Sequence, residues 1–128
     1  MYKTICLMKR RPDLTMEQFM AHYENVHSKI GERMMAGRAS HYIRRYLCPI
    51  AFPMPNDTKP AEPPYDVIME MWYASEEAFR QATQALTPEN LAELTADEKN
   101  LFDRANMHIF HVEEHSSLMP ELTCPPQN

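Results

Sequence analysis

Glycine is scarce in this chain: 2 of its 128 residues are Gly, against 11 Pro and 11 Met. Gly31 and Gly37 cannot form a GxGxxG or GxxxxGK motif, in which glycines let the backbone approach a phosphate closely. We therefore expect no nucleotide held by a glycine-rich loop, and no other cofactor. The methionines favour a soft apolar pocket or an ordinary core, because the unbranched thioether fills irregular space.

The chain also lacks paired cysteines, an excess of basic residues and long apolar runs. Cys6, Cys48 and Cys124 are odd in number and have no CxxC spacing, so we expect reduced thiols. The formal net charge of −5 argues against a nucleic-acid partner. An apolar run of membrane-spanning length is missing, and the apolar N-terminal segment is too short for a signal peptide. These absences predict a soluble cytoplasmic protein with no membrane partner.

Hydrophobic periodicity and capping residues predict the element order βαββαβ. The expected strands cover residues 2–9, 40–48, 65–73 and 107–113. One helix is expected over 15–35, and a second helical region from Ser75 to about Arg104, with breaks at Thr87–Pro88 and at Thr95. This order is typical of a ferredoxin-like α+β fold, in which an antiparallel sheet carries its helices on one face. We expect one domain over 1–115 and an irregular tail over 116–128.

Two features suggest that this domain does more than enclose a core. Several strands are apolar on both faces, so a homodimer that covers the open face of the sheet is expected. Six prolines between 49 and 64 predict a long extended loop, either a lid over a site or a solvated connection.

The first helix brings a histidine onto an apolar stripe. Thr15 and Gln18 have capping-box spacing, and from there apolar residues repeat at three- and four-residue steps. His27 and Tyr23 lie on that stripe. In a regular helix His22 would lie about 140° around the axis from His27. We therefore expect no metal site from these two histidines, and no other ligand cluster has zinc spacing.

A longer motif resembles the EthD-like family of the dimeric α+β barrel superfamily. It comprises the run from Lys9 to Phe19, then His22, Tyr23 and His27, with Tyr46, Asp66, 70–73 and 76–79 extending the likeness across about residues 2–114. The resemblance implies a ferredoxin-like monomer, a barrel-forming homodimer and a pocket between sheet and helices. It does not imply one reaction, since relatives include polyketide cyclases, decarboxylases, dehydratases and proteins without assigned activity.

Four residues are the candidate catalytic set. His27 is the expected general acid or base, because imidazole titrates near neutral pH, although a core histidine bonded to a carbonyl is the alternative. Tyr23 and Tyr46 could hold an enolate or phenolate by hydrogen bonding, or could simply be packing aromatics. Asp66 could orient His27 or act as a base, or it could only end the proline-rich loop.

A second set is expected to bind substrate. Trp72 could stack on an aromatic ligand or anchor the core, and Phe19 shares the helix stripe with His27. Of the two histidines on the last strand, His111 is preferred over His108 as the one facing the helices. Arg104 could guide an anionic substrate, or could complement the helix dipole.

These residues predict a cofactor-independent enzyme that acts on a phenolic, polyketide-like or other aromatic substrate. His-mediated proton transfer would serve a cyclase, decarboxylase, dehydratase or lyase. The alternatives are a cofactor-free monooxygenase and a non-catalytic ligand-binding protein of the same fold. The enzyme hypothesis predicts an apolar cavity of several hundred Å³ that touches His27 and a tyrosine, whereas the non-catalytic ligand-binding or accessory alternative predicts His27 hydrogen-bonded inside a filled core with no cavity beside it.

Overall fold

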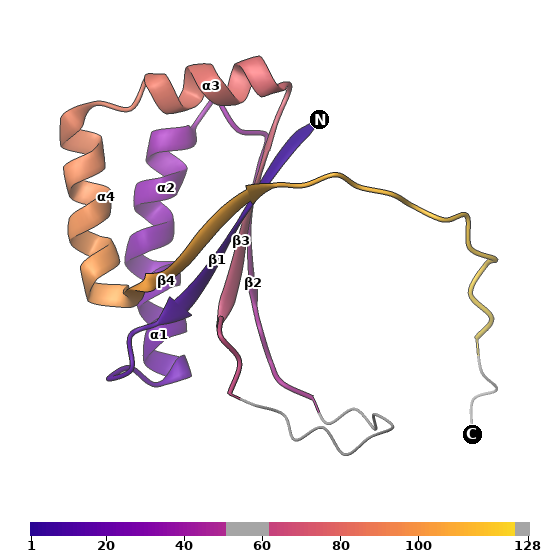
Figure 1. The fold of residues 1–128 in the computed structure, drawn as a ribbon, viewed down its shortest axis with the longest axis horizontal. Coiled ribbons are helices and arrows are strands. Elements are labelled where there is room, and N and C mark those ends of the chain that lie inside the picture. Colours follow the sequence, from indigo (N-terminus) through magenta and orange to yellow (C-terminus); the bar gives the residue numbers. More distant parts are fainter. Residues whose placement is uncertain (51–61, 125–128) are drawn as a thin grey trace.

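The computed structural model describes residues 1–50 and 62–124. Its four strands form one sheet in the order β2-β3-β1-β4, and all neighbouring strands are antiparallel. The helices cover one face of this sheet (Figure 1). The elements in chain order are β1 (Tyr2–Arg10), α1 (Met16–His22), η1 (Tyr23–His27), α2 (Ser28–Met35), β2 (His41–Tyr46), β3 (Val67–Tyr73), α3 (Glu76–Gln84), α4 (Pro88–Leu101) and β4 (Phe102–His111). The predicted ferredoxin-like α+β fold is confirmed.

The central strand β1 shows how the sheet separates its two faces. Thr4, Cys6 and Met8 are buried under the helices, while Ile5 and Leu7 between them are half-buried on the open face. This alternation follows from the two-residue repeat of a strand. Most of the expected loop over 49–64 lies outside the described residues, so its role as a lid stays a prediction.

The first helix begins where the sequence predicts. The Thr15 hydroxyl accepts a hydrogen bond from the Gln18 amide (3.1 Å), and the Gln18 side chain accepts one from the Thr15 amide (2.9 Å). The helix ends at Met35, and Gly37 follows with a φ of 76°, a left-handed conformation that glycine adopts without steric cost. Its middle turn, η1, is a π-helix that the sequence analysis did not anticipate.

The second helical region differs from the prediction. The expected break at Thr95 is wrong, because α4 runs uninterrupted from Thr87, whose hydroxyl caps Asn90, to Leu101. Inside a continuous helix the backbone amides are already bonded, so a Thr-x-x-Glu pair there has nothing to cap. The strand β4 also begins earlier than expected, at Phe102.

An irregularity in β4 explains that early start. Met8 pairs with Met107, but the next residue of β1, Lys9, pairs with Asp103, so the residues between 103 and 107 bulge out of the ladder. A bulge interrupts the two-residue repeat by which a strand is recognised in the sequence. Arg104 therefore lies inside β4 and not, as expected, at a helix end.

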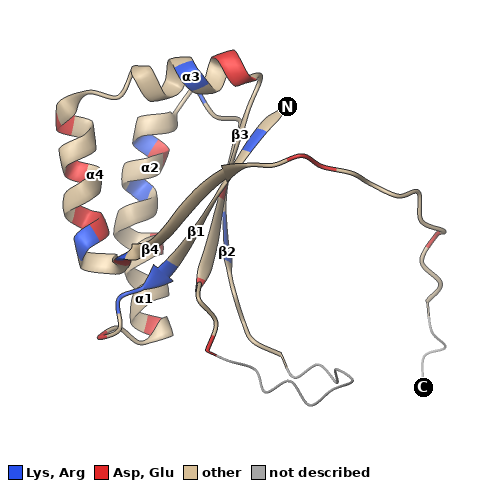
Figure 2. Ribbon diagram, viewed as in Figure 1, with Lys and Arg blue, Asp and Glu red and all other residues tan. Residues whose placement is uncertain are grey.

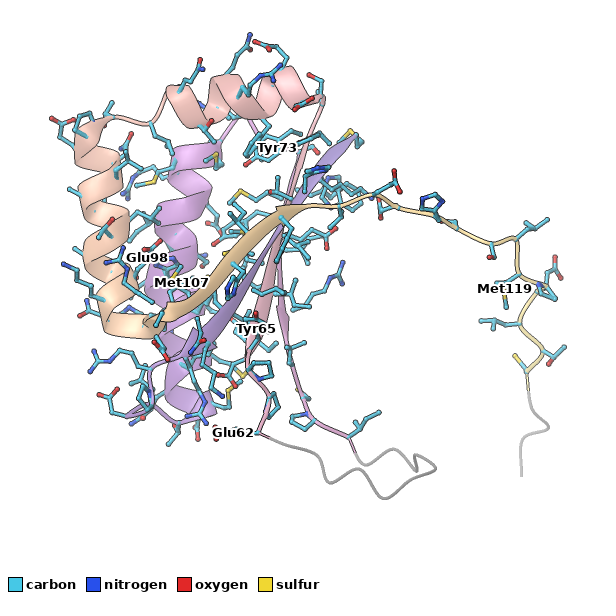
Figure 3. All side chains as sticks on the ribbon, in the orientation of Figure 1. Glu62, Tyr65, Tyr73, Glu98, Met107 and Met119 are labelled. Carbon is cyan, nitrogen blue, oxygen red and sulfur yellow. The ribbon has the colours of Figure 1, made fainter. Side chains whose placement is uncertain are left out.

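The described residues carry mixed charge on the helices, and a described tail leaves the body of the protein. Acidic and basic positions alternate along α2, whereas α4 is mainly acidic (Figure 2). No described helix is long and apolar enough to cross a membrane. After β4, the Val112 amide donates to the Lys3 carbonyl (3.0 Å), and the chain then extends away from the sheet past Met119 (Figure 3).

Candidate active site

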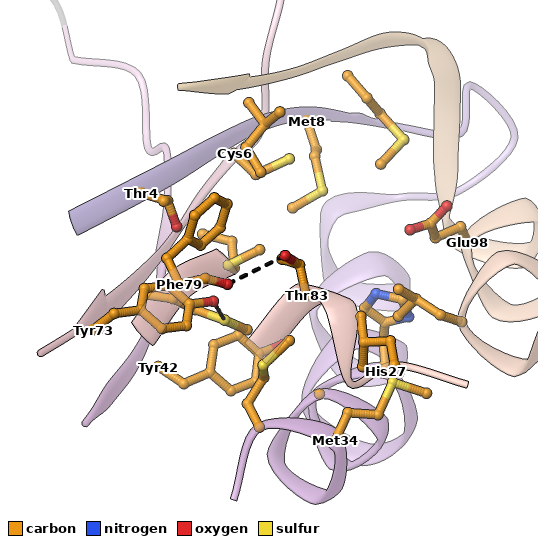
Figure 4. A pocket seen from close by; sticks show the side chains of 18 of the residues that line it. Thr4, Cys6, Met8, His27, Met34, Tyr42, Tyr73, Phe79, Thr83 and Glu98 are labelled. Carbon is orange, nitrogen blue, oxygen red and sulfur yellow. Dashed lines mark hydrogen bonds between the residues drawn. The ribbon is translucent and has the colours of Figure 1, made fainter. Parts of the chain in front are cut away.

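A cavity of about 360 Å³ lies between the helical layer and the sheet (Figure 4). Its wall is contributed by all four strands, by the first helix and by α3 and α4. Six of the chain's methionines line it: Met8, Met34, Met35, Met69, Met71 and Met107. Thioether side chains make a polarisable, adaptable surface that suits flat apolar ligands. The cavity also touches His27, Tyr23 and Tyr42, as the enzyme hypothesis predicts.

His27 is held in place by a carboxylate from α4. Its Nδ1 lies 2.8 Å from Oδ2 of Asp97, and both side chains are buried. The ring also packs edge-on against Tyr23 and Phe102, with centroid distances of 5.2 and 5.3 Å. Because Nδ1 is engaged by Asp97, Nε2 is the nitrogen available to a ligand in the cavity.

The same carboxylate binds His22, which corrects the sequence analysis. The distance from His22 Nε2 to Asp97 Oδ1 is 2.8 Å. His22 was expected on another face from His27, but the amide of Ser28 donates to the carbonyl of Tyr23, five residues earlier. A π-turn closed by such i→i+5 bonds brings residues five apart onto one side of the helix. The two histidines consequently lie beside one another on Asp97.

The ionisation of Asp97 sets the tautomer of His27. Burial raises the pKa of the Asp97 carboxyl, but the hydrogen bonds from His22 and His27 outweigh it and hold the pKa below its usual value. A carboxylate only accepts hydrogen bonds, so each histidine donates a proton to it. In neutral His27 the proton is therefore on Nδ1, and Nε2 carries a lone pair that can accept a proton.

Glu98, the residue after Asp97, places a second titratable group at the cavity. Burial raises the pKa of its carboxyl, an effect partly opposed by His27 and Arg104. Figure 4 shows Glu98 and His27 on one side of the cavity, across from Thr4 and Tyr73. A carboxyl group and an imidazole in different environments can exchange protons with one bound molecule.

The tyrosines divide into two groups. Tyr23 is buried and lines the cavity together with Tyr42, a strand tyrosine that the sequence pattern does not single out. Burial raises the pKa of both phenols, so both are protonated at neutral pH. Gly31 allows the Tyr42 ring to approach α2, since a Cβ at that position would lie 2.9 Å from the Tyr42 hydroxyl oxygen.

Tyr46 lies outside the cavity wall. Its hydroxyl donates to Glu24 (2.5 Å), which also pairs with Arg44 at 2.6 Å. These two partners lower the pKa of the Glu24 carboxyl despite its partial burial, with the Arg44 hydrogen bond the largest contribution. Tyr46 therefore links β2 to η1, and the expectation that it holds a substrate oxyanion is not supported by its position.

Two more of the expected residues lie away from His27. Asp66 accepts a hydrogen bond from the Arg10 amide (2.9 Å) and pairs with Lys9 (3.3 Å), so it fixes the chain before β3. The carboxylate that orients His27 is Asp97 instead. Phe19 is fully buried and packs against Phe102 (centroids 5.8 Å apart), which makes it a core residue and not a cavity wall.

Trp72 occupies the open face of the sheet. Its neighbours Met71 and Tyr73 line the cavity, so the strand alternation directs the indole to the opposite side. The indole Nε1 donates to Glu70 (2.6 Å), and Lys3 Nζ lies 3.7 Å from the ring centroid. Trp72 cannot stack on a ligand in this cavity.

The expected substrate-binding residues near the last strand, Arg104 and His111, lie outside the cavity wall. Arg104 does not line the cavity, and its Nε lies 3.6 Å from Oε2 of Glu98. His111 shares the helix-side face, as its pairing opposite Thr4 shows, but it is exposed and stacks on Tyr2 at 5.6 Å. His108 pairs opposite Leu7, so its side chain lies on the open face of the sheet, where Nδ1 is 3.0 Å from the Tyr65 hydroxyl oxygen.

Cys6 lines the cavity, but its thiol is poorly suited to act as a nucleophile. Burial, with the nearby charge of Glu98, raises the pKa of the Cys6 thiol to about 11, so the thiol is not a nucleophile near neutral pH. Within residues 1–50 and 62–124, no group of three His, Cys, Asp or Glu is arranged to hold a metal ion.

The fold and its cavity define a ferredoxin-like α+β protein with an internal ligand-sized site. The family model described as the EthD domain matches residues 11–105, most of the chain. The chain belongs to the EthD family. A search of curated protein sequences finds no significant match.

Solved structures agree on the fold. An ethyl tert-butyl ether D family protein from Bacillus halodurans superposes with a TM-score of 0.60 at 19% identity, covering 90% of this chain and 100% of its own. A protein from Arabidopsis thaliana gives 0.58 at 13% identity, covering 93% and 100%. A dimeric ferredoxin-like protein of unknown function from Bacteroides fragilis gives 0.53 at 14%, covering 88% and 95%. At these identities the likeness concerns the fold alone.

Proposed function

We propose that this protein is a cofactor-independent enzyme that transfers protons in a phenolic, polyketide-like or other aromatic substrate. The observation that carries the proposal is the Asp97-bound His27 at the wall of an apolar cavity. Cyclisation, dehydration, decarboxylation and lyase chemistry all begin or end with such a proton transfer.

In the proposed mechanism, Nε2 of His27 removes an acidic C–H or phenolic proton from the bound substrate. The imidazolium that forms is stabilised by Asp97, whose carboxylate lies 2.8 Å from Nδ1. The electron pair remains on the substrate as an enolate or phenolate. The proton then returns from Nε2 to the substrate or to its leaving group, so His27 ends in its starting state.

The cavity offers two further groups to the substrate oxygen. Tyr42, whose pKa is raised by burial, keeps its hydroxyl proton near neutral pH and can donate it. Glu98, whose pKa is raised by burial, can exchange a second proton at the same end as His27. Tyr23 lines the same cavity beside His27.

The cavity volume favours an enzyme or ligand-binding protein over a purely structural one, since about 360 Å³ lies within the range of small-molecule sites. The same proton removal also serves a cofactor-free monooxygenase, in which the carbanion reacts with oxygen. Product mass distinguishes the reactions, because oxygenation adds mass whereas dehydration and decarboxylation remove it.

A homodimer is part of this proposal. The Bacteroides fragilis protein and one from Thermobifida fusca are described as dimeric. In this chain the open sheet face carries Phe110, which is 49% exposed, with Ile5 paired opposite it and Leu7 on the same face of β1. Covering that face with a second copy would bury this apolar surface, and light scattering would measure the mass.

The test is a screen of phenols, anthrones and aromatic polyketides with product mass analysis. On a substrate found in this way, His27→Ala is expected to lower kcat about 100-fold or more, as for loss of a general base. His27→Gln, which keeps a hydrogen-bonding side chain, should be equally impaired. Unchanged turnover in both variants would contradict the role of His27.

A further inference from the structure

We propose that the cavity selects uncharged aromatic compounds and excludes carboxylates, with Glu98 as the residue that determines this specificity. The inference rests on the proposed function in taking this cavity as the substrate site. It narrows the substrate class to neutral phenols, ketones and esters, and it removes the decarboxylation of a free aromatic acid from the candidate reactions.

The composition of the cavity wall disfavours an anionic ligand. Its polar side chains are hydroxyls, a thiol, the His27 imidazole and the Glu98 carboxyl, and none of the described lining residues is Lys or Arg. A carboxylate that leaves water for an apolar cavity needs a cationic or multiply hydrogen-bonding partner. The six methionine side chains supply no such partner.

The positive charges near the cavity are already compensated by carboxyl groups. Arg104 does not line the cavity, and its guanidinium is directed to Glu98, at 3.6 Å. If His27 is protonated, its charge is balanced by Asp97, 2.8 Å away. An anion bound at Nε2 would thus meet a neutral ion pair and the carboxyl group of Glu98.

Glu98 and His27 line the same end of the cavity (Figure 4). A substrate that presents its reacting group to His27 presents the same end of the molecule to Glu98. Arg104 pairs with Glu98 from outside the cavity, so the wall at this end offers an anion a carboxyl group and no cationic side chain that is free to bind it. An aromatic acid is therefore rejected where a neutral isostere is accepted.

Two ligands of the same shape test the proposal: 2-naphthamide and 2-naphthoate. Calorimetric titration at about pH 8 keeps the naphthoate ionised. We expect the amide to bind at least about tenfold more tightly than the acid, a difference of about 1.4 kcal/mol. Equal affinities would overturn the proposal.

The variant Glu98→Gln tests the assigned residue. It should raise the affinity for naphthoate several-fold relative to the affinity for naphthamide, and measurable binding of naphthamide shows that the variant is folded. Glu93→Gln removes the same charge from an exposed position of α4 and should change neither affinity. No gain for naphthoate in Glu98→Gln would overturn the role of Glu98.

These measurements separate the inference from the proposed function. Ligand binding does not require chemistry, so the preference for naphthamide can hold even if His27→Ala retains full turnover. Conversely, efficient turnover of a free aromatic acid by His27 would support the proposed function and overturn the charge selectivity.

Discussion

His22 and His27, five residues apart on one helix, bind the two oxygens of a single carboxylate. The Nε2 of His22 and the Nδ1 of His27 each lie 2.8 Å from an oxygen of Asp97. The half-buried His22 forms the outer member of this group, and the buried His27 faces the cavity. Asp97 thereby connects a solvent-accessible imidazole to the proposed catalytic one.

The first prediction concerns the orientation of His27. Asp97→Asn should lower kcat by about 100-fold or more with a smaller effect on KM, because the amide can hold His27 in the wrong tautomer. The shape of the pH–rate profile should change as well, which loss of packing alone would not cause. The control is Asp13→Asn, an exposed residue paired with Arg11. Wild-type kcat in Asp97→Asn would contradict the assignment.

Asp97 should also give a pH-dependent contribution to stability. Its pKa is lower in the folded protein than the unfolded value of about 3.9. The stabilisation is therefore fully present above that value and is lost as the pH falls toward the folded pKa. The difference in free energy of unfolding between wild type and Asp97→Asn should shrink below about pH 4, as measured by urea denaturation. A difference that stays constant down to pH 2 would rule out this linkage.

The π-turn of the first helix predicts an asymmetry between deletion and insertion. Deleting Asn25, which is exposed in η1, would leave the two histidines four residues apart, a spacing that shares one face of a regular α-helix. We expect this variant to fold and to keep both contacts to Asp97. Inserting Ala after Asn25 should rotate His22 about 100° around the helix axis relative to His27 and lower the stability of the protein. Circular dichroism and thermal unfolding measure the folding and stability of the two variants. An insertion variant more stable than the deletion variant would refute the role assigned to the π-turn.

Gly31 should be intolerant of a side chain. A Cβ there would lie 2.9 Å from two atoms of the Tyr42 ring system. Overpacking of this kind costs about 1–3 kcal/mol, partly offset by the gain of about 1 kcal/mol in helix propensity for Ala. Gly31→Ala should therefore lose stability and weaken ligand binding through Tyr42. Gly37→Ala, with open space around it, should lower stability through its positive φ but leave binding intact.

The two tyrosines of β2 that contact the first helix, Tyr42 and Tyr46, should respond differently to loss of the hydroxyl. Tyr46→Phe removes a hydrogen bond to Glu24 outside the cavity, so it should cost about 1 kcal/mol of stability and leave kcat nearly unchanged. Tyr42→Phe removes a hydroxyl in the cavity and should lower kcat. The opposite pattern would restore Tyr46 as the oxyanion donor.

Local patterns predicted much of the framework. The capping box at Thr15 and the apolar stripe through Tyr23 and His27 depend on neighbours in the sequence, and the structure confirms both. The alternation of β1 and β3 predicted which residues share a face. It did not predict which face lies under the helices, and Trp72 was misplaced for that reason.

The partners of His27 could not be predicted in this way. Asp97 is separated from His27 by 70 positions, and it reaches the imidazole only because α4 packs beside η1. Asp97 is a buried acidic residue of a mostly exposed helix, a feature that the sequence alone does not show. Tyr42 was visible as a strand tyrosine, but its place at the cavity depends on the close approach permitted by Gly31.

The sequence by itself determined the order of the strands and helices, the start of the first helix and the inward position of His27, because these follow from periodicity and capping within short segments. Only the tertiary structure decided that Asp97 orients His27, that His22 lies beside it and that Glu98 faces the cavity. The packing of α4 against η1 joins segments that are distant in the chain, and the π-turn departs from the 3.6-residue repeat by which a helix face is read from the sequence.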